Sequence, residues 1–349
     1  MLANSFGSSF EHVVVSLDGR RDALARLEPG VSVTVAEERR LSRYGLATGL
    51  PRLWSSLRRV RHDALLTYNW GSIEWALAHR LRPACPHLHF EDGFGVEESR
   101  SQLARRVWLR RLALSGRTRV VVPSETLHEI ALQRWRLCAD RVVLIPNGVD
   151  RAQLELEAAA PLAVRASPDE VVIGTLGGLR AEKNQARLLR IAGRLPRTAR
   201  WRVAIAGDGP LRQVLEREAA RAGLGDRVSF VGTVEQPGAF LAGIDVFVLT
   251  SDTEQMPLSV LEAMALGLPV LATAVGDLGR MLPDGSACLF TPEDEAGFAA
   301  RLAGLIGGPA ARARFGAANR ARSETFTAER MVARHQALLE EVLRRHSHA

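Results

Sequence analysis

Short apolar runs recur along the first half of the chain, and stretches with helical spacing lie between them. The runs occupy residues 12–17, 31–36, 64–69, 87–91, 119–124 and 141–148. The clearest helical stretches are 99–114 and 125–137. Short β-rich runs that alternate with helices predict a parallel sheet with helices on both faces. The first half is therefore expected to form one α/β domain.

The same pattern starts again after residues 151–170, a stretch rich in alanine and charge that is expected to be a linker. The later apolar runs occupy 171–177, 201–207, 227–233, 245–251, 269–276 and 287–292, with helices expected at 184–194, 210–223, 257–267 and 294–307. Two such arrays predict an α/β protein with two Rossmann-like, doubly wound domains that face a cleft. We place these domains at 1–155 and 156–325. We expect a C-terminal segment, 326–349, to be helical over 326–345 and to cross back to the first domain.

The start of the first array departs from this pattern. A doubly wound domain normally opens with a strand, a glycine-rich turn and a helix. Here residues 2–7 resemble the end of a helix, so the run at 12–17 is interpreted as a second strand. The hypothesis is that the opening strand and its glycine turn are missing, which would leave backbone groups of the sheet unpaired.

Composition narrows the class of protein. Apolar residues make up 46% and charged residues 24% of the 349 residues, which is typical of a soluble globular protein. The sequence holds no 18-residue apolar run and no secretory signal pattern, so the cytoplasm is the expected compartment. The three cysteines, Cys85, Cys138 and Cys288, are scattered and indicate neither a disulfide framework nor a zinc site.

The basic charge leaves several partners open. The formal net charge is +7, which suits nucleic acid, an anionic membrane surface or phosphorylated substrates. A composition rich in arginine, alanine, glycine and leucine explains the same charge without any partner. Lys183 is nevertheless the only lysine in the chain. A compact ammonium differs in size and donor geometry from a guanidinium, so arginine would not replace it equally.

The first candidate motif is residues 251–277, where an apolar run is followed by a helix that is expected to open near Pro257. The first N–H groups of a helix lack intrahelical partners and favour an anion. Glu254 precedes this helix and Glu262 lies within it, eight positions later. Carboxylates accept hydrogen bonds from sugar and ribose hydroxyls. The alternative is that both are ordinary acids of a loop and a surface helix.

The second motif, residues 174–192, follows the first strand of the second domain. Gly177 and Gly178 permit a tight turn and a close approach of the backbone to a ligand. Arg180 and Lys183 then place two cations beside a helix N-terminus, an arrangement that would bind a diphosphate. A solvated basic turn is the alternative. A third motif, Gly-Asp-Gly-Pro at 207–210, is interpreted mainly as a structural turn.

These motifs, in this order, make residues 171–325 resemble the donor-binding domain of the family-4 glycosyltransferases, the glycosyl transferases group 1. The resemblance implies the GT-B fold and a UDP-, GDP- or ADP-sugar donor. It also implies transfer with retained anomeric configuration, and no metal or other cofactor. Lys183 and Arg180 would stabilise the leaving diphosphate together with the helix N-terminus. The sequence lacks the D-x-D triplet that binds metal in the other glycosyltransferase fold.

The resemblance also assigns the remaining donor contacts. Glu254 would lie near the donor sugar, and Glu262 would hold the ribose hydroxyls. Further contacts to the sugar, phosphates and base would come from Met256, Pro257, Leu258, Ser259, Val231 and Gly232. The chain departs from the family at Gly178, where an arginine is usual, and at Gln255 and Met256, where glycine and an aromatic residue are usual. Arg180 would supply the missing charge from two positions further on.

The first domain resembles the family less closely. Residues 87–95 end a strand, and relatives place a histidine in this loop, near the reacting sugar. Asp92 aligns with that histidine, and His89 is the second catalytic candidate. His87 and His89 would share one strand face, but a metal site is not expected because no third ligand has suitable spacing. Ser124 and Asn147 are expected at strand ends, as cleft residues or as turn-formers.

The helix expected at 99–114 carries Arg105, Arg106, Arg110 and Arg111. It would lie on an anionic membrane, at the inner face, or pack one side on the sheet as an ordinary surface helix. The acceptor would be a glycan, a lipid-linked molecule or a small molecule. Three other functions stay open: a nucleotide-sugar epimerase, a catalytically dead relative that still binds nucleotide sugar, and a nucleic-acid-binding protein. The last is disfavoured because the sequence has no nucleic-acid-binding motif.

Overall fold

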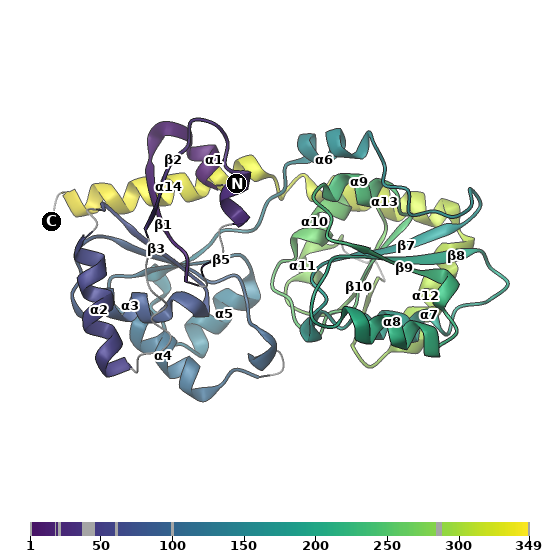
Figure 1. The fold of residues 1–349 in the computed structure, drawn as a ribbon, viewed down its shortest axis with the longest axis horizontal. Helices are drawn as coiled ribbons and strands as arrows, with labels where there is room; N and C mark the ends of the chain where they lie inside the picture. Colours follow the sequence, from purple (N-terminus) through teal and green to yellow (C-terminus); the bar gives the residue numbers. More distant parts are fainter. Residues whose placement is uncertain are drawn as a thin grey trace. The chain divides into compact units, whose positions relative to one another are not determined.

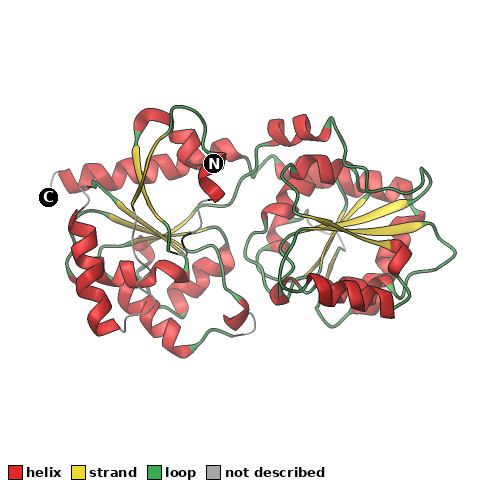
Figure 2. Cartoon of the chain, in the orientation of Figure 1, coloured by secondary structure: helices red, strands yellow, loops and turns green. Residues whose placement is uncertain are grey.

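The computed structural model describes residues 2–17, 19, 22–36, 46–59, 62–98, 101–283 and 288–347. The predicted elements at 99–114 and 287–292 begin with residues that lie outside this description. The chain divides into two compact units (Figures 1 and 2). The first contains Met1–Asp92, Ala104–Ile145 and Arg330–Ala349, and the second contains Gly93–Leu103 and Pro146–Glu329.

The second unit is built on a parallel sheet of six strands in the order β12-β11-β10-β7-β8-β9. The strands are β7 (Val171–Leu176), β8 (Trp201–Ala206), β9 (Val228–Gly232), β10 (Val246–Leu249), β11 (Val270–Thr273) and β12 (Leu289–Phe290). Each lies within an apolar run identified from the sequence. In the four inner strands, β7, β8, β10 and β11, nearly all residues are buried, as expected for a sheet covered by helices on both faces.

Two hydrophobic cores lie on opposite faces of this sheet. One contains side chains of α7 (Gln185–Ala192), α8 (Arg212–Arg221) and α12 (Glu295–Gly307). The other contains side chains of α6 (Arg151–Ala158), α9 (Pro237–Ala242), α10 (Leu258–Ala265) and α11 (Leu278–Met281). The unit is therefore doubly wound, and α13 (Pro309–Ser323) completes it.

Helix α6 differs from the expected linker at 151–170. Asp150 caps its N-terminus by accepting a hydrogen bond from the Gln153 N–H at 2.9 Å. Leu154 is buried in the core beneath α9 and α10. The alanine- and charge-rich composition that suggested a linker also has high helix propensity, and a single buried leucine docks the helix.

The first unit has a parallel sheet of four strands in chain order: β3 (Leu65–Tyr68), β4 (His87–Phe90), β5 (Arg119–Val122) and β6 (Val142–Leu144). Strands β1 (Glu11–Val15) and β2 (Ser32–Ala36) form a second, separate parallel pair. Among the described strands, no ladder joins the pair to the four-stranded sheet. The hypothesis of a missing opening strand stays a prediction.

Helices cover both faces of the four-stranded sheet. Helices α2 (Leu46–Arg59) and α3 (Ile73–Leu81) pack together on one side, followed by α4 (Ala104–Leu114) and α5 (Glu125–Gln133). On the other side lie α1 (Leu2–Phe6) and the C-terminal helix α14 (Ala328–Ser347), whose Leu338 and Leu339 pack against Phe90. Helix α14, the yellow helix at the C-terminus in Figure 1, thus lies almost entirely in the first unit. Within the described residues no helix is long and apolar enough to cross a membrane.

Candidate functional site

The strand order of the second unit creates a topological switch point between β7 and β10. From β7 the chain adds β8 and β9 on one side and then returns to add β10, β11 and β12 on the other. Ligands of open α/β sheets bind at the carboxyl ends of the strands where the order reverses in this way. The loop after β7 holds residues 177–184, which are part of the second candidate motif, and the loop after β10 holds residues 250–257, which include the start of the first.

Lys183 and Glu254 meet at this switch point. The Lys183 ammonium donates to Glu254 Oε1 at 2.6 Å, and the Ser251 hydroxyl donates to the same oxygen at 2.7 Å. Only 21% of the lysine side chain and 9% of the glutamate side chain are exposed. An ammonium has three donors, so this lysine retains the capacity to bind a further anion. The structure brings together the two residues that the sequence placed in separate motifs.

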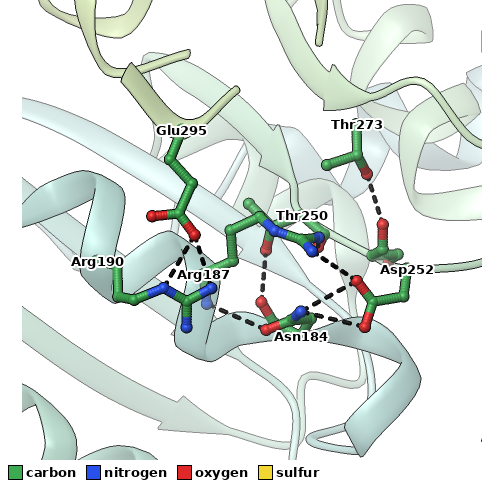
Figure 3. A network of polar contacts seen from close by, with 8 residues as sticks. Asn184, Arg187, Arg190, Thr250, Asp252, Thr273 and Glu295 are labelled. Carbon is green, nitrogen blue, oxygen red and sulfur yellow. Dashed lines mark hydrogen bonds and ion pairs between the residues drawn. The ribbon is translucent and has the colours of Figure 1, made fainter. Parts of the chain in front are cut away.

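A second layer of polar contacts fixes the two loops to one another (Figure 3). Asn184 has a left-handed backbone, with φ 44° and ψ 49°, and its amide donates to both oxygens of Asp252 at 3.0 and 3.1 Å. Arg187 donates to Asp252 Oδ1 and to the Thr250 carbonyl, both at 2.7 Å. The sequence analysis missed these residues. Their only signal was their position beside Lys183 and Glu254.

Glycines allow three loops at this edge to pack backbone against backbone. Gly207 has φ +126°, and a Cβ there would overlap the carbonyl oxygen of Gly177. Its N–H donates to the carbonyl of Gly232 at 2.7 Å, and Gly232 itself has φ +83°. Only glycine fits such approaches at low cost. The Gly-Asp-Gly-Pro motif is therefore structural here, and it places Val231 and Gly232 beside the turn at Gly177.

Arg180 lies over the second glycine of the candidate phosphate loop. A Cβ at Gly178 would lie 3.2 Å from Arg180 Nε. The guanidinium pairs with Glu182 at 3.1 Å, and 56% of the Arg180 side chain is exposed. The position where the family resemblance predicts an arginine is thus covered by the side chain of Arg180.

Helix α10 begins at Leu258, with Pro257 at the N-cap. The loop before it is held from two sides. The Asp277 N–H donates to the Gln255 carbonyl at 2.9 Å, and the Asn147 amide donates to the Met256 carbonyl at 2.9 Å. The helix therefore opens next to Pro257, as expected, one residue after the start of the predicted stretch 257–267. The first N–H groups, at Leu258 and Ser259, follow directly, as a helical anion site requires.

Glu262 lies further along α10 and is half-buried. Burial, followed by repulsion from the Glu157 carboxylate of α6, raises the pKa of Glu262 from its ordinary value of 4.5 to about 7. Partial removal of a carboxylate from water, close to a second carboxylate, makes its ionised form costly in free energy. A ligand hydroxyl that donates to it would offset part of this cost.

Three of the polar candidates in the first unit are buried in the protein. His87 Nε2 and His89 Nδ1 both contact Thr67 Oγ1 at 2.8 Å, so the two histidines share a strand face as expected. Arg110 donates to Glu91 at 3.1 Å, and both side chains are 0% exposed. His89 is also fully buried, so its side chain is not exposed to a ligand. Its catalytic role stays a prediction. Among the described residues, no three metal-binding side chains cluster.

The remaining candidates lie at strand ends. Asp92 is exposed, directly after β4 and Glu91, and its carboxylate accepts a hydrogen bond from the Asn69 amide at 3.3 Å. Ser124 is the N-cap of α5 and accepts from the Leu127 N–H at 3.0 Å, which makes it a helix-capping residue. Asn147 bonds to the Met256 loop of the second unit, as described above.

Comparisons with known proteins match both halves of the chain. Residues 163–322 match the family model of the glycosyl transferases group 1, and residues 2–153 match that of glycosyltransferase family 4. The putative glycosyltransferase EpsF of Bacillus subtilis is 34% identical over 171 residues, 46% of this chain and 44% of that protein. A D-inositol 3-phosphate glycosyltransferase of Stackebrandtia nassauensis is 28% identical over 293 residues, 76% of this chain and 65% of that one.

Solved structures share the fold. A sucrose-phosphate synthase of Thermosynechococcus elongatus has a TM-score of 0.74 at 23% identity, over 85% of this chain and 78% of that one. HepE of Anabaena, in complex with UDP, has a TM-score of 0.69 at 19% identity, over 89% of this chain and 87% of that one. The chain spans less than half the length of the first curated relatives that it matches.

Proposed function

Because the chain belongs to the group 1 glycosyltransferase family, we propose that it transfers a sugar from a nucleotide-sugar donor to an acceptor hydroxyl, with retention of the anomeric configuration. Its fold is GT-B. The observation that carries the proposal is the Lys183–Glu254 pair at the switch point, 2.6 Å apart. The pair places a cation that can bind phosphate beside a carboxylate that can bind sugar hydroxyls, at one edge of the sheet.

In this proposal the second unit binds the donor. Lys183 and the exposed Arg180 meet the diphosphate, together with the first N–H groups of α10, at Leu258 and Ser259. Gly177 and Gly178 let the phosphates approach the main chain. These groups stabilise negative charge as the nucleotide diphosphate leaves, which is the step that most needs electrostatic help. We propose that they serve in place of a metal ion.

The nucleoside and sugar are held by the flanking groups. Glu262 accepts hydrogen bonds from the ribose hydroxyls, and Glu254 accepts from the donor sugar. Val231 and Gly232 lie beside the base, and Met256 and Pro257 shape the sugar pocket. Asp92 and His89 belong to the acceptor side, where Asp92 is the exposed group.

Peripheral contact with an anionic membrane is the second part of the proposal. Arg106 and Arg110 turn inward and stack over Trp70, with guanidinium carbons 4.7 and 5.0 Å from the ring centroid. The outward face of α4 then presents Arg105, Trp108, Arg111 and Leu112. Trp108 is 64% exposed, and large exposed aromatic side chains flanked by arginines are typical of helices that lie at a lipid surface.

A thermal-shift screen against UDP, GDP and ADP, and their sugars, tests the donor site. A ligand that binds only the folded protein raises Tm by mass action. One nucleotide series should raise the Tm of the wild type, and the increase should be lost in Lys183→Ala and Glu262→Ala. Arg190→Ala is the matched control, because Arg190 lies on α7, the helix that follows this loop, and pairs with Glu295 of α12. If no nucleotide shifts the wild-type Tm, the assignment of the donor site is wrong.

Transfer itself needs a second measurement. With the donor identified, incubation with candidate acceptors should give a glycosylated product whose anomeric configuration matches that of the donor. Release of free nucleotide and an altered sugar without an acceptor would favour an epimerase. Donor binding with no turnover under any condition would favour the catalytically dead relative.

A further inference from the structure

Asn69 lies directly after β3 and has a backbone conformation that is rare for a residue with a side chain. Its φ is 56° and its ψ is −177°. Glycine is almost the only residue that uses this region, and other residues persist there only where the surrounding structure holds them. Here the Ser72 N–H and hydroxyl donate to the Asn69 carbonyl at 3.2 and 3.1 Å. These bonds turn that carbonyl into the following turn and away from the sheet.

The side chain of Asn69 replaces its backbone in the ladder between β3 and β4. Tyr68 pairs with Phe90, and the Asn69 N–H donates to the Phe90 carbonyl at 2.7 Å. In a regular parallel ladder the next bond would run from the Asp92 N–H to the Asn69 carbonyl. The Asp92 N–H donates instead to Asn69 Oδ1 at 2.7 Å.

The same amide also holds the Asp92 side chain, because Asn69 Nδ2 donates to Asp92 Oδ2 at 3.3 Å. One side chain therefore fixes both the main chain and the carboxylate of Asp92. A glycine would adopt this backbone with less strain but would make neither contact. The contacts to Asp92 thus explain an asparagine at this position, whereas the backbone conformation alone does not.

From this geometry we infer that Asn69 is a positioning residue, which holds the Asp92 carboxylate at the carboxyl edge of the first sheet for contact with the reacting sugar. The inference rests on the proposed function, since it takes Asp92 as the acceptor-side group. Asn69 acts through Asp92 and does not itself need to contact the substrate.

Several titratable groups face Asp92 and define how the effect can be measured. Although Asp92 is exposed, desolvation by the surrounding protein raises the pKa of its carboxyl, and the Asn69 hydrogen bond is the largest effect that opposes the rise. The Glu91 carboxylate adds to the rise, whereas His335 of α14 and His89 of β4 lower the pKa. Tyr68 is 48% exposed, and desolvation followed by the Asp92 charge raises its pKa, so that Tyr68 stays neutral. Loss of the Asn69 amide should therefore raise the pKa of Asp92 further.

The test is Asn69→Gly, which keeps the backbone conformation and removes both contacts. We expect kcat to fall by about 10-fold or more, the loss expected when a reacting group is misplaced. The acid limb of the pH profile of kcat/KM should move to higher pH. Donor affinity should not change, and Tm should be unchanged or higher. In an Asp92→Asn background, Asn69→Gly should have little further effect on kcat. The ¹³C carboxyl resonance of Asp92, assigned by its absence in Asp92→Asn, should titrate at a higher pH in Asn69→Gly.

Ser72→Ala is the matched control, because it weakens the same turn without touching Asp92. It should lower Tm and leave the acid limb in place. His335→Gln tests whether the acid limb belongs to the neighbouring histidine; the Asn69-dependent shift should persist in it. Wild-type kcat and an unmoved Asp92 resonance in Asn69→Gly would overturn the inference. If the wild type transfers no sugar at all, the proposed function fails, while the Asp92 titration still decides whether Asn69 holds that carboxylate.

Discussion

Lys183 and Glu254 form a 2.6 Å ion pair at the edge of the second sheet, although 71 positions separate them in the chain. The pair exists because β7 and β10 are neighbours in the sheet and their following loops leave it at the switch point. It gives the Glu254 carboxylate, whose side chain is 9% exposed, a cationic partner. It also holds the only lysine where a diphosphate would arrive.

Lys183 variants should separate charge from shape. We expect Lys183→Ala to weaken nucleotide diphosphate binding by about 10- to 100-fold, since a charge-assisted hydrogen bond contributes roughly 1.5–3 kcal/mol. Lys183→Arg should recover only part of this loss, because the planar guanidinium cannot occupy the ammonium position while it pairs with Glu254. Calorimetric titration with the preferred nucleotide measures both. Equal affinities for the wild type and Lys183→Arg would show that charge alone suffices.

Glu262 should make stability and donor binding depend on pH in opposite directions. Its folded-state pKa is about 7, above its ordinary value of 4.5. Folding therefore favours the protonated form of Glu262. The contribution of this group to the free energy of unfolding is fully present below pH 4.5 and is lost as the pH rises through about 7. Glu262→Gln should therefore stabilise the protein at about pH 8 by up to roughly 2–3 kcal/mol, and much less at about pH 5.

Donor binding should show the reverse dependence in the wild type, because ribose hydroxyls donate best to the ionised carboxylate. Affinity should rise as the pH increases through the Glu262 pKa, and this rise should be absent in Glu262→Gln. Urea denaturation and calorimetry at both pH values measure the two effects. Glu216→Gln, on the exposed face of α8, is the control. A pH-independent difference between Glu262→Gln and the wild type would contradict the explanation.

Asp252 should be important for stability as well as for the site. Its carboxylate holds Arg187, of which only 9% of the side chain is exposed, and the Asn184 amide. We expect Asp252→Ala to lower the free energy of unfolding by about 2–4 kcal/mol, since it leaves a nearly buried guanidinium without its partner. Asp169→Ala breaks the exposed pair with Arg200 and should cost less than about 1 kcal/mol. Similar losses in the two variants would argue against the network in Figure 3.

The outward face of α4 should bind anionic lipid. Replacement of Trp108, Arg105 and Arg111 by alanine should reduce co-sedimentation with vesicles that contain phosphatidylglycerol. Each arginine near an anionic surface contributes about 1 kcal/mol, so added salt should weaken the wild-type binding as well. Leu81→Ala is the control, because Leu81 is 63% exposed on α3. Equal binding to neutral phosphatidylcholine vesicles would contradict an electrostatic contact.

Several features could be predicted from the sequence because they depend on local patterns. The apolar runs locate the strands of both sheets, since a strand buried on both faces must be apolar throughout. The helices at 185–192, 212–221, 258–265 and 295–307 fall within the predicted stretches. The turn glycines at 207 and 232 were visible because their positive φ, and at Gly207 also a close backbone approach, favour glycine. The order of these motifs was sufficient to indicate the family and the fold.

Contacts between distant segments could not be predicted in this way. Arg110 looked like one of four surface arginines, yet it is fully buried against Glu91, because helical phase alone does not say which face meets the sheet. Residues 151–158 looked like a linker, and one buried leucine makes them a docked helix.

The sequence by itself thus determined which residue types stand at the strand ends: the only lysine, the paired glutamates, the glycine turns and Asp92. The tertiary structure decided which of them meet. Strand order brings Lys183 to Glu254, and the backbone turn at Asn69 brings its amide to Asp92. The physical reason is that local sequence sets the conformation of short segments. Contacts between distant residues depend instead on the packing of whole sheets and helices, which no single segment encodes.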